Sequence, residues 1–563
     1  MDFYKKDVFS LFDGSRTQFT IPVYQRAYAW EEPQWSTFLN DLLEHLEGKN
    51  NYFYGNILLE ASKDSNGGFE IIDGQQRITT LSIFIRSLIN VLSRRKEERI
   101  DLEEKEKVSI KYGGKPKLRP VEYDELCYTE IIVNNKDTYE VASPSQQRIL
   151  DAKQYFQEKL EMLNSEQLLT LFDKLERTAL TTIIINDKKE AALMFELQNN
   201  RGKDLTNMER LKSYLMYQMY VYNDERNDTE QNINYLASIF EEIYRTINRI
   251  KSLDEDSVLI YHNNAYNKKG YSYRNLEDVK EEFKRLTSNT TKIEWIKSYV
   301  SELKTTFDNI EKFENLKNRE ANKLRNVGMP AYAWAFVIRG YKYLGDNRSK
   351  LSELFQILEK VIFRAKLINS RANIQERLNS IMLGFEGDLA ALGKDIRKKL
   401  NEAGYWSDDM MKTYLDSNMY GNKVLNYLLW EYEDHIQNRG YRIDNVSLEN
   451  EQIEHISPQT PEEGEEFATG YETPYDEEFE KNYLNRLGNL MLISGSHNAS
   501  IGNKPFKDKL ASYNKNPLLN QQAEIKDFCS QEKWGKEQIQ KRHYKILDFC
   551  LERWQLIPNI ENN

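Results

Sequence analysis

The sequence predicts a mixed α/β and α protein with an α+β N-terminal domain, a helical middle and a small mixed C-terminal domain. Short β-like runs alternate with turns near the N-terminus, and helical patterns dominate from about Tyr220 to Gln437. An alternating run returns at Val446–Ile456. A chain of 563 residues is also too long for one hydrophobic core. We therefore expect three domains, at 1–220, 221–424 and 425–563.

The N-terminal domain is expected to contain a strand, a tight turn and a helix in direct succession. Strands are predicted at Phe19–Tyr24, Tyr52–Glu60 and Phe69–Ile72, each bounded by Gly, Pro, Asp or Asn. After Arg77, apolar residues recur at helical spacing as far as Leu92. The run D-G-Q-Q-R, Asp73–Arg77, is therefore expected at a helix N-terminus.

Two further elements are predicted before the helical middle. The β-branched run Thr181–Asn186 is typical of a strand. Thr206 and Glu209 have the spacing of a capping box, so a helix is expected to begin at Asn207 and to continue through Met216 or beyond. The stretch N-N-R-G-K-D just before it is predicted to be a loop.

Composition and charge restrict the class of protein. No apolar run approaches the ~20 residues that cross a bilayer, so no membrane partner is expected. The N-terminus does not resemble a secretory signal, which favours the cytoplasm. A net charge of −11 disfavours non-specific coating of DNA, so any nucleic-acid contact must be local. The three cysteines lack C-x-x-C spacing and indicate neither a disulfide framework nor a thiolate metal site.

The turn Asp73–Arg77 has the residue types of a phosphate-binding site. Its glycine lets the backbone approach an oxyanion, amide donors stand at a helix start, and the planar guanidinium of Arg77 suits phosphate. On this motif alone, an ordinary β-to-α turn with a surface arginine is the commoner explanation. The chain has no G-x-x-x-x-G-K-[ST] run, so a P-loop NTPase is excluded.

The C-terminal part carries residues suited to cutting a phosphodiester. E-H-I-S-P-Q at Glu454–Gln459 is followed by L-G-N-L-M-L-I-S-G-S-H-N at Leu487–Asn498. A histidine base and one divalent cation can activate water and stabilise charge on phosphate oxygens, and oxygen ligands suit Mg²⁺ or Mn²⁺. Adjacent strand residues point to opposite faces, so a bend near Pro458 is required for both Glu454 and His455 to serve one site. A buried structural histidine beside turn asparagines is the alternative.

These two regions together resemble the GmrSD-type modification-dependent restriction endonucleases. The N-terminal resemblance rests on I-P-V-Y-Q-R-A-Y-A-W at Ile21–Trp30, on D-G-Q-Q-R and on F-E-L-Q-N-N-R-G-K-D-L-T. The C-terminal resemblance rests on E-H-x-x-P, L-G-N-L and a later asparagine. It implies a ParB/sulfiredoxin-like N-terminal domain and a small HNH-like (ββα-metal) nuclease domain with flanking helices. The helical middle matches only loosely.

The resemblance also implies roles for individual residues. Nucleotide-binding roles fall on Gln25, Arg26, Asp73, Gly74, Gln75, Gln76, Arg77, Asn200 and Arg201. At the other end, His455 is the general base, Asn489 orients it or the metal, Glu454 and Asn498 are metal ligands, and Lys504, Lys507 and Lys509 contact DNA phosphates. A plain loop is an equal alternative for Asn200 and Arg201, as is a solvated helix face for the lysines. His497 is interpreted as an exposed residue without a role, and a spare metal ligand is the alternative.

The implied function is a nucleotide-dependent endonuclease that cleaves modified phage DNA and uses Mg²⁺ or Mn²⁺ and a nucleoside triphosphate. Nucleotide binding would license the metal site by favouring one arrangement of the domains. The acidic segment Pro461–Glu480 is expected either to lower unstimulated cutting or to be a solvated insertion. An RNase toxin of abortive infection and a non-catalytic nucleotide or DNA sensor are the alternatives. The modification, the triphosphate, the type of strand break and any homo-oligomer stay open.

Overall fold

The computed structural model divides into two compact units, which are described separately. The first contains residues 1–260 and 274–314, and the second contains residues 261–273 and 315–563. The division into domains at 1–220, 221–424 and 425–563 stays a prediction. The structure describes all residues except 1, 15–16, 45–52, 63–67, 186–205, 223–228, 273–275, 403, 438–447, 449, 461–470, 472–475, 516, 530–531 and 557–563.

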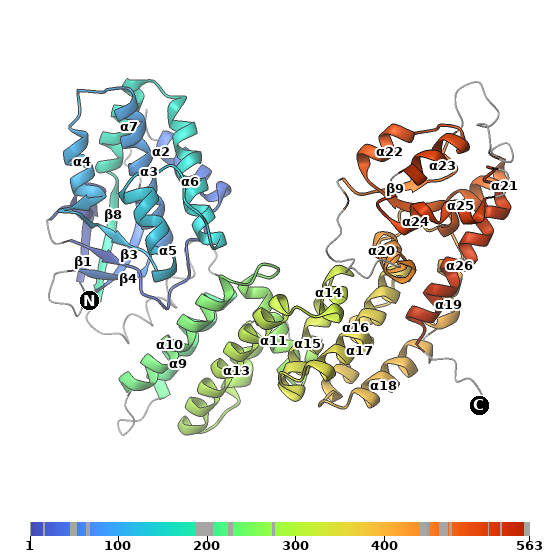
Figure 1. Ribbon diagram of the computed structural model, residues 1–563. Coiled ribbons are helices and arrows are strands. Elements are labelled where there is room, and N and C mark those ends of the chain that lie inside the picture. Colours follow the sequence, from blue (N-terminus) through green and yellow to red (C-terminus); the bar gives the residue numbers. More distant parts are fainter. Residues whose placement is uncertain are drawn as a thin grey trace. The chain divides into compact units, whose positions relative to one another are not determined.

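The first unit is built on a six-stranded mixed sheet with strand order β1-β8-β3-β4-β2-β7 (Figure 1). Its strands are β1 (Asp2–Asp7), β2 (Phe19–Thr20), β3 (Phe53–Ala61), β4 (Phe69–Asp73), β7 (Leu118–Arg119) and β8 (Ala179–Ile185). β3 runs antiparallel to β4 and parallel to β8. The predicted strands are confirmed, although β2 is shorter than its predicted run. A separate hairpin joins β5 (Lys111–Tyr112) and β6 (Lys115–Pro116).

The helices that precede β8 in the chain gather beside this sheet, and α3 lies among them (Figure 1). Almost every side chain of α3 is buried, and Phe84 on this helix makes edge-to-face contacts with Phe38 and Phe156, at 5.2 and 5.1 Å between ring centroids. The helices of the first unit are α1 (Val8–Phe12), α2 (Glu32–Glu44), α3 (Gln75–Arg94), α4 (Leu102–Ser109), α5 (Glu122–Tyr128), η1 (Thr129–Val133), α6 (Pro144–Glu161), α7 (Ser165–Glu176), α9 (Asn207–Tyr222), α10 (Thr229–Ile247), α12 (Leu276–Lys284) and α13 (Asn289–Asn315). α11 (Glu255–Tyr266) contributes residues to both units.

Local signals predicted the start of α9 correctly. The helix begins at Asn207, and the backbone N–H of Thr206 donates to Glu209 Oε2 at 3.1 Å while Glu209 N–H donates to Thr206 Oγ1 at 3.2 Å. This reciprocal pair is a capping box, which satisfies two N–H groups that a helix start leaves open. The capping box and the extension of the helix beyond Met216 are therefore confirmed.

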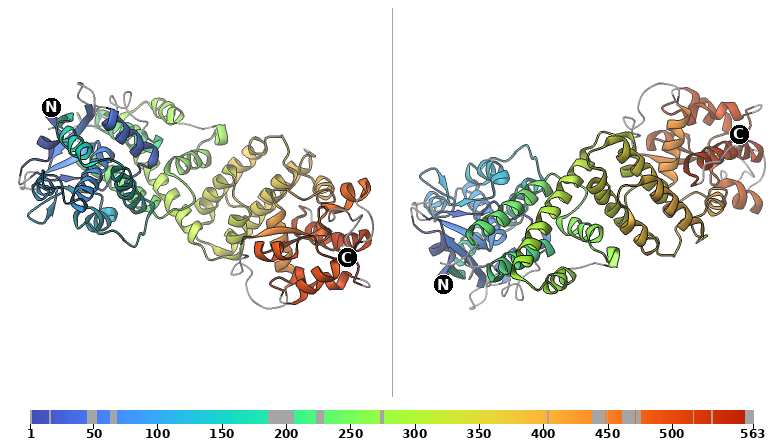
Figure 2. Two further views of the ribbon diagram at one scale, coloured as in Figure 1. Left: turned by 90° about the horizontal axis from the view of Figure 1, so that it is seen from above. Right: turned by 90° about the horizontal axis from the view of Figure 1, so that it is seen from below.

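The second unit is mainly helical, and Figure 2 shows its long helices side by side in two further views. Its elements before the small sheet are η2 (Gly270–Ser272), α14 (Arg319–Asn326), α15 (Ala331–Leu344), α16 (Arg348–Ile368), α17 (Ile374–Gly384), α18 (Leu389–Glu402), α19 (Asp408–Leu415) and α20 (Leu425–Ile436). Every regular element that the structure describes between Thr229 and Ile436 is a helix, so the helical middle is confirmed. Among the described helices, none is long and apolar enough to cross a membrane.

The last part of the second unit contains a two-stranded antiparallel sheet followed directly by a helix. β9 (Gln452–His455) pairs with β10 (Leu490–Ile493), and α22 (Gly495–Ile501) follows β10. Ser494 caps α22 by accepting from His497 N–H. The remaining helices are α21 (Glu477–Phe479), η4 (Glu480–Leu484), η5 (Leu487–Asn489), α23 (Phe506–Lys515), α24 (Asn520–Ala523), α25 (Ile525–Phe528) and α26 (Lys536–Trp554). The order β9, β10, α22 places the two predicted motifs next to each other.

Candidate active site

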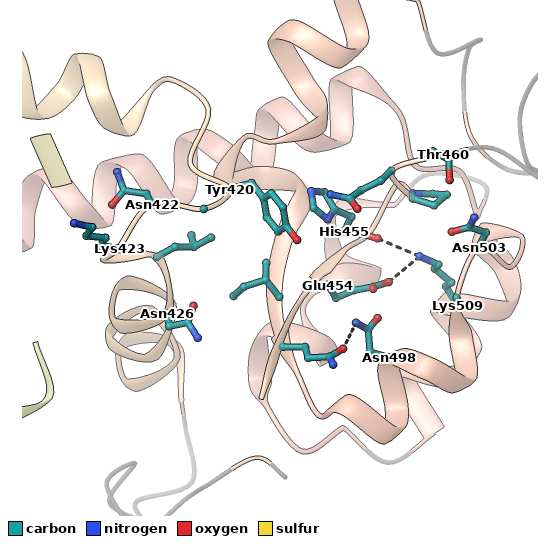
Figure 3. Close-up of a pocket in the computed structure, with 17 residues that line it drawn as sticks. Tyr420, Asn422, Lys423, Asn426, Glu454, His455, Thr460, Asn498, Asn503 and Lys509 are labelled. Carbon is teal, nitrogen blue, oxygen red and sulfur yellow. Dashed lines mark hydrogen bonds and ion pairs between the residues drawn. The ribbon is translucent and has the colours of Figure 1, made fainter. Parts of the chain in front are cut away.

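A pocket of about 700 Å³ in the second unit collects four of the residues that the sequence analysis singled out (Figure 3). They are Glu454, His455, Asn498 and Lys509. β9 supplies the first two, α22 the third and α23 the fourth. Glu454 and His455 both line this pocket although they are neighbours in sequence, as the expected bend after β9 requires. A carboxylate, an imidazole, an amide and an ammonium group therefore share one cavity.

The imidazole of His455 is held between an amide and an aromatic ring. Its Nε2 lies 2.9 Å from Asn485 Oδ1, and its ring is 4.4 Å from the ring of Tyr420 at an interplanar angle of 61°. Because an amide oxygen can only accept, Nε2 carries the proton and Nδ1 keeps a lone pair. Burial lowers the pKa of His455 below its ordinary value, although the bond to Asn485 acts in the opposite direction. The neutral form required of a base is favoured.

Glu454 is a buried carboxylate that is paired with the ammonium group of the buried Lys509. Its Oε1 accepts from Lys509 Nζ at 2.7 Å and from the hydroxyl of Tyr513 at 2.8 Å. Among the described residues, none is bonded to Oε2. Burial raises the pKa of Glu454, and the Lys509 ammonium opposes this. The carboxylate is thus fixed through one oxygen, and the other remains for a ligand.

Lys509 occupies a different environment from the one expected of a DNA contact. Its side chain is 1% exposed and also donates to the carbonyls of His455 and Ile456, at 3.1 and 3.3 Å. Lys504 and Lys507, in contrast, are exposed, and Lys507 lies 3.1 Å from Glu532. A lysine that is enclosed and bonded in this way cannot reach a DNA backbone without leaving its partners, so Lys509 acts within the pocket wall.

Asn489 does not line the pocket, and its side chain bonds to the backbone next to the pocket. Its Oδ1 accepts from Ser457 N–H at 2.8 Å and from Trp534 Nε1–H at 3.2 Å, and its Nδ2 donates to the carbonyls of Ser457 and Leu484. The side chain is fully buried. These bonds fasten the chain directly after His455 to the turn before β10. Asn489 therefore acts on His455 only through the position of the backbone.

The glycine of the L-G-N-L run has a packing role. A Cβ on Gly488 would lie 1.9 Å from the carbonyl oxygen of Ile539 in α26. Arg542 of the same helix donates to the carbonyls around this turn, those of Leu487, Gly488 and Leu490. The turn that carries Asn489 is thus pressed against α26, which only glycine permits.

The donor set of the pocket fits one loosely held divalent cation. No group of three or more His, Cys, Asp or Glu side chains that could hold a metal occurs among the described residues. Mg²⁺, however, is usually bound through one or two carboxylates while waters and substrate phosphates fill the remaining positions. Glu454 Oε2 and the side-chain oxygen of Asn498 suit this, because Asn498 uses its Nδ2 to donate to Gln452 at 2.7 Å. The residues present fit such an ion.

His497 lies outside the pocket and has a packing role. Its Nε2 is 2.8 Å from Ser512 Oγ, and Gln522 Nε2 is 3.4 Å from its Nδ1. These contacts link α22 to α23 and α24. The interpretation that this histidine is not needed for the chemistry stays a prediction.

The loop before α20 contributes residues to the pocket that the sequence analysis missed. Tyr420 covers His455, and Met419 N–H donates to the carbonyl of Asn485 at 2.9 Å. Arg486 donates to the carbonyl of Asp416 at 3.2 Å. The loop is therefore fastened to the turn that holds His455. No motif marks Tyr420, while the nearness of Asn485 to the L-G-N-L run was an available signal.

In the first unit, the turn Asp73–Arg77 joins β4 to α3 as expected. Gly74 adopts φ 99°, in the left-handed region, at the N-terminal cap of α3. Gln76 accepts from the N–H of Ala29 at 2.8 Å and donates to the carbonyl of Ala27 at 2.9 Å. The predicted strand, turn and helix are confirmed, and Gln76 ties the turn to the Ile21–Trp30 run.

Arg77 is held at the start of α3 against a glycine of β3. Its Nη2 lies 3.3 Å from Asp73 Oδ2, and its carbonyl accepts from the Tyr54 hydroxyl at 2.6 Å. A Cβ on Gly55, where φ is 109°, would lie 2.3 Å from Arg77 Nη1. Gly55 therefore leaves the space that the guanidinium occupies.

The other predicted nucleotide residues belong to a buried polar network. Gln25 donates to the carbonyl of Ile72 at 2.9 Å and accepts from Gln75 Nε2 and Lys212 Nζ at 3.4 and 3.2 Å. Burial lowers the pKa of Lys212, a residue that the sequence analysis missed, to about 8. Nε of Arg26 lies 2.8 Å from Glu209 Oε1. Asn200 and Arg201 lie outside the described residues.

Comparison with known families agrees with both ends of the chain. The GmrSD restriction endonuclease N-terminal domain matches residues 8–216, and the GmrSD restriction endonuclease C-terminal domain matches residues 407–549. Together the matches cover more than half of the sequence. None of the curated proteins compared with the chain matches it. The class of protein so defined is a restriction endonuclease. The chain belongs to the GmrSD family, and the resemblance seen in its motifs is confirmed.

Proposed function

We propose that the chain cleaves modified DNA at the pocket of His455, with one divalent cation, Mg²⁺ or Mn²⁺, held by Glu454 and Asn498. The observation that carries the proposal is one pocket that contains an imidazole with its proton fixed on Nε2 and a carboxylate with one oxygen open. The order β9, β10, α22 supports an HNH-like (ββα-metal) fold for this part of the chain.

The residues of the pocket divide the work of phosphodiester hydrolysis. Nδ1 of His455 takes a proton from the attacking water, while Asn485 keeps the other nitrogen protonated and the ring oriented. Tyr420 shields one side of the ring. When bound, the cation stabilises negative charge on the scissile phosphate and the leaving oxygen. Lys504 and Lys507, which are exposed, are proposed DNA-backbone contacts.

We further propose that the first unit is ParB/sulfiredoxin-like and that a nucleoside triphosphate binds at the turn Asp73–Arg77 and is hydrolysed there. The left-handed Gly74 and the N-terminus of the long helix α3 support an anion site at this turn. Lys212 adds a buried cation to the same network. Coupling to cleavage requires that the nucleotide bind one arrangement of the chain more tightly than another.

The enzyme is proposed to act in the cytoplasm, where incoming DNA is found, and as a homo-oligomer or a monomer.

One assay tests this function against its alternatives. Purified protein with Mg²⁺ is incubated with modified DNA, unmodified DNA or RNA, with and without each triphosphate. Cleavage of modified DNA alone supports the proposal. Cleavage of RNA favours a toxin, and binding without cleavage favours a sensor.

The acidic segment Pro461–Glu480 is proposed to lower unstimulated cutting; its residues 461–470 and 472–475 lie outside the described residues. If deletion of the segment leaves basal nicking unchanged, this inhibitory role is removed.

Asn485→Leu is expected to lower kcat for DNA cleavage by about 10- to 100-fold while leaving the Kd for DNA unchanged. The substitution removes the acceptor that fixes the proton on Nε2 of His455, so a large fraction of the imidazole adopts the wrong tautomer. Single-turnover cleavage and a DNA-binding assay measure the two effects. Asn485→Asp keeps an acceptor at this position and is expected to retain most of the activity. An equal loss in both variants would contradict the positioning role.

Gly55→Ala is expected to weaken triphosphate binding and to lower the free energy of unfolding by about 1–3 kcal/mol. The new methyl group displaces the guanidinium of Arg77, and the backbone is strained because φ is 109°. Gly113→Ala is the matched control, since φ is also positive there but a Cβ would meet nothing within 4 Å. Nucleotide titration and urea unfolding separate the two effects. Unaltered binding in Gly55→Ala and Arg77→Ala would remove the proposed phosphate site.

A further inference from the structure

His543 is a buried histidine of the second unit that the proposed chemistry does not use. Its side chain on α26 is 0% exposed, and its Nε2 lies 2.9 Å from Asp416 Oδ1. Because a carboxylate oxygen only accepts, Nε2 carries the proton, and burial favours this neutral form by lowering the pKa of His543. Nδ1 is also buried and has no hydrogen-bond partner among the described residues. Such a ring is costly as packing alone, so its bond to Asp416 requires an explanation.

Asp416 connects His543 to Arg486. It caps the C-terminus of α19 and begins the loop that leads to α20. Arg486 Nη2 lies 3.3 Å from Asp416 Oδ1 and donates to the carbonyl of Asp416 at 3.2 Å. The imidazole is fully buried, so water cannot take the place of Asp416 as its acceptor. The start of the loop is therefore held by α26 on one side and by Arg486 on the other.

The two partners of the His455 ring lie close in sequence to Arg486 and Asp416. Asn485, whose Oδ1 is 2.9 Å from His455 Nε2, directly precedes Arg486. Tyr420, whose ring lies 4.4 Å from that of His455, follows Asp416 within the same loop (Figure 3). A shift of Asp416 relative to Arg486 would therefore move the groups that orient the imidazole.

Backbone contacts join the same segments. Met419 N–H donates to the carbonyl of Asn485 at 2.9 Å, so the loop and the turn before β10 are fastened to each other. A Cβ on Gly488 would lie 2.8 Å from the backbone nitrogen of His543, so this turn packs on α26 at that histidine. The backbone of His543 thus supports the turn, and its imidazole holds the loop. One residue of α26 contacts both segments that supply the partners of His455.

We propose that His543 is a positioning residue for DNA cleavage, which acts on the imidazole of His455 through Asp416. This role rests on the nuclease function proposed for the His455 pocket. Neither His543 nor Asp416 lines that pocket, so both act on the rate of cleavage without a contact to DNA. When the donor of His543 is lost, Asp416 is no longer held against α26, and the ring of His455 loses part of its fixed orientation.

A matched pair of substitutions isolates the donor. Glutamine and methionine have side chains of similar length, but only glutamine has an N–H to donate to Asp416. His543→Met is expected to lower the rate constant of single-turnover DNA cleavage by about 10- to 100-fold, while the Kd for DNA in EDTA stays unchanged. His543→Gln should recover most of the rate. Equal losses in the two variants, or no loss in His543→Met, would overturn the proposal.

Ile546→Val is the control for packing, because Ile546 is a fully buried residue of the same helix and loses one methyl group. It should lower Tm and keep the cleavage rate of the folded protein within a few-fold of the wild type. A rate as low as that of His543→Met would assign the loss to packing. Adding His543→Met to Asp416→Ala should cause no further loss, because both remove one contact, and additive losses would contradict the link.

A measurement without DNA separates this role from the nuclease function. The chain has six histidines, and the ring ¹⁵N signals of histidine-labelled protein report which nitrogen carries the proton. Loss of one signal in His455→Ala identifies His455. At about pH 8, where histidine is neutral, the proton of His455 is expected on Nε2 in the wild type and in His543→Gln, and on both nitrogens in exchange in His543→Met.

The two measurements together give distinct outcomes for the two proposals. An unchanged proton position on His455 in His543→Met overturns the positioning role, whether or not the wild type cleaves DNA. A changed position in a protein whose wild type cleaves no DNA supports the link from His543 to His455 and removes only the nuclease function.

Discussion

His455→Ala is expected to abolish detectable cleavage of modified DNA, a loss of at least about 10²- to 10⁴-fold. The imidazole is the one group in the described pocket that combines an accepting nitrogen with a fixed orientation, given by Asn485 on one side and Tyr420 on the other. Without it, the attacking water has no base of suitable pKa. Single-turnover cleavage at saturating protein, with Mg²⁺ and triphosphate, measures the effect.

The second histidine of this region provides the matched control. His497 lies on α22 directly before Asn498, which lines the pocket. Its ring nitrogens, however, contact Ser512 and Gln522. His497→Ala is therefore expected to keep cleavage within a few-fold of the wild type. The triphosphatase rate of His455→Ala should also be nearly unchanged, because the turn Asp73–Arg77 lies in the other unit. Loss of both activities together would mean that they share one site, and surviving cleavage would end the general-base assignment.

The parts of the molecule that local rules govern could be predicted from the sequence. The turn Asp73–Arg77 and the capping box of Thr206 and Glu209 are set by residues within a few positions of one another. The strand that reaches His455 was also indicated, because the run Val446–Ile456 alternates apolar and polar residues. In each case, the backbone geometry follows from short-range chemistry.

The contacts that define the candidate site could not be predicted, because they join residues distant in sequence. Asn485 and Tyr420 reach His455 only after the loop before α20 has been fastened to the turn before β10. The family resemblance implied that Asn489 orients His455 or the metal, yet Asn489 bonds to the backbone of Ser457 and does not line the pocket. An asparagine that orients a histidine and one that fastens its loop are the same letter in a sequence.

Lys509 shows how a signal can be present and still be misjudged. In the sequence it belongs to a basic run, N-K-P-F-K-D-K, which is typical of a surface. Lys509 and Tyr513, however, are four positions apart and share one helix face with the buried Phe506. That face turns both polar groups toward Glu454, where they donate to the same oxygen. The spacing indicated a buried face, but only the fold identifies the carboxylate that it meets.

Lys509→Met is expected to lower the free energy of unfolding by about 3–5 kcal/mol, because it leaves the carboxylate of Glu454 buried without its cation. Lys509 and Glu454 are 1% and 5% exposed in their side chains and 2.7 Å apart, so solvent cannot replace the lost partner. The variant also loses the bonds to the carbonyls of His455 and Ile456, so cleavage should fall with stability. Urea unfolding in EDTA measures the stability without any contribution from a bound cation.

Two further variants separate the buried charge from a general loss of packing. Lys507→Met changes the same residue type on the same helix where its side chain is 72% exposed, and the change in stability should stay within about 0.5 kcal/mol. Adding Glu454→Gln to Lys509→Met removes the uncompensated charge and should recover much of the stability, because a neutral amide is less costly to bury than a carboxylate. Cleavage should not return, because the double variant no longer has the charged Glu454 carboxylate that is proposed to bind the cation. A double variant as unstable as Lys509→Met alone would show that the ammonium stabilises the backbone after β9 and not the carboxylate.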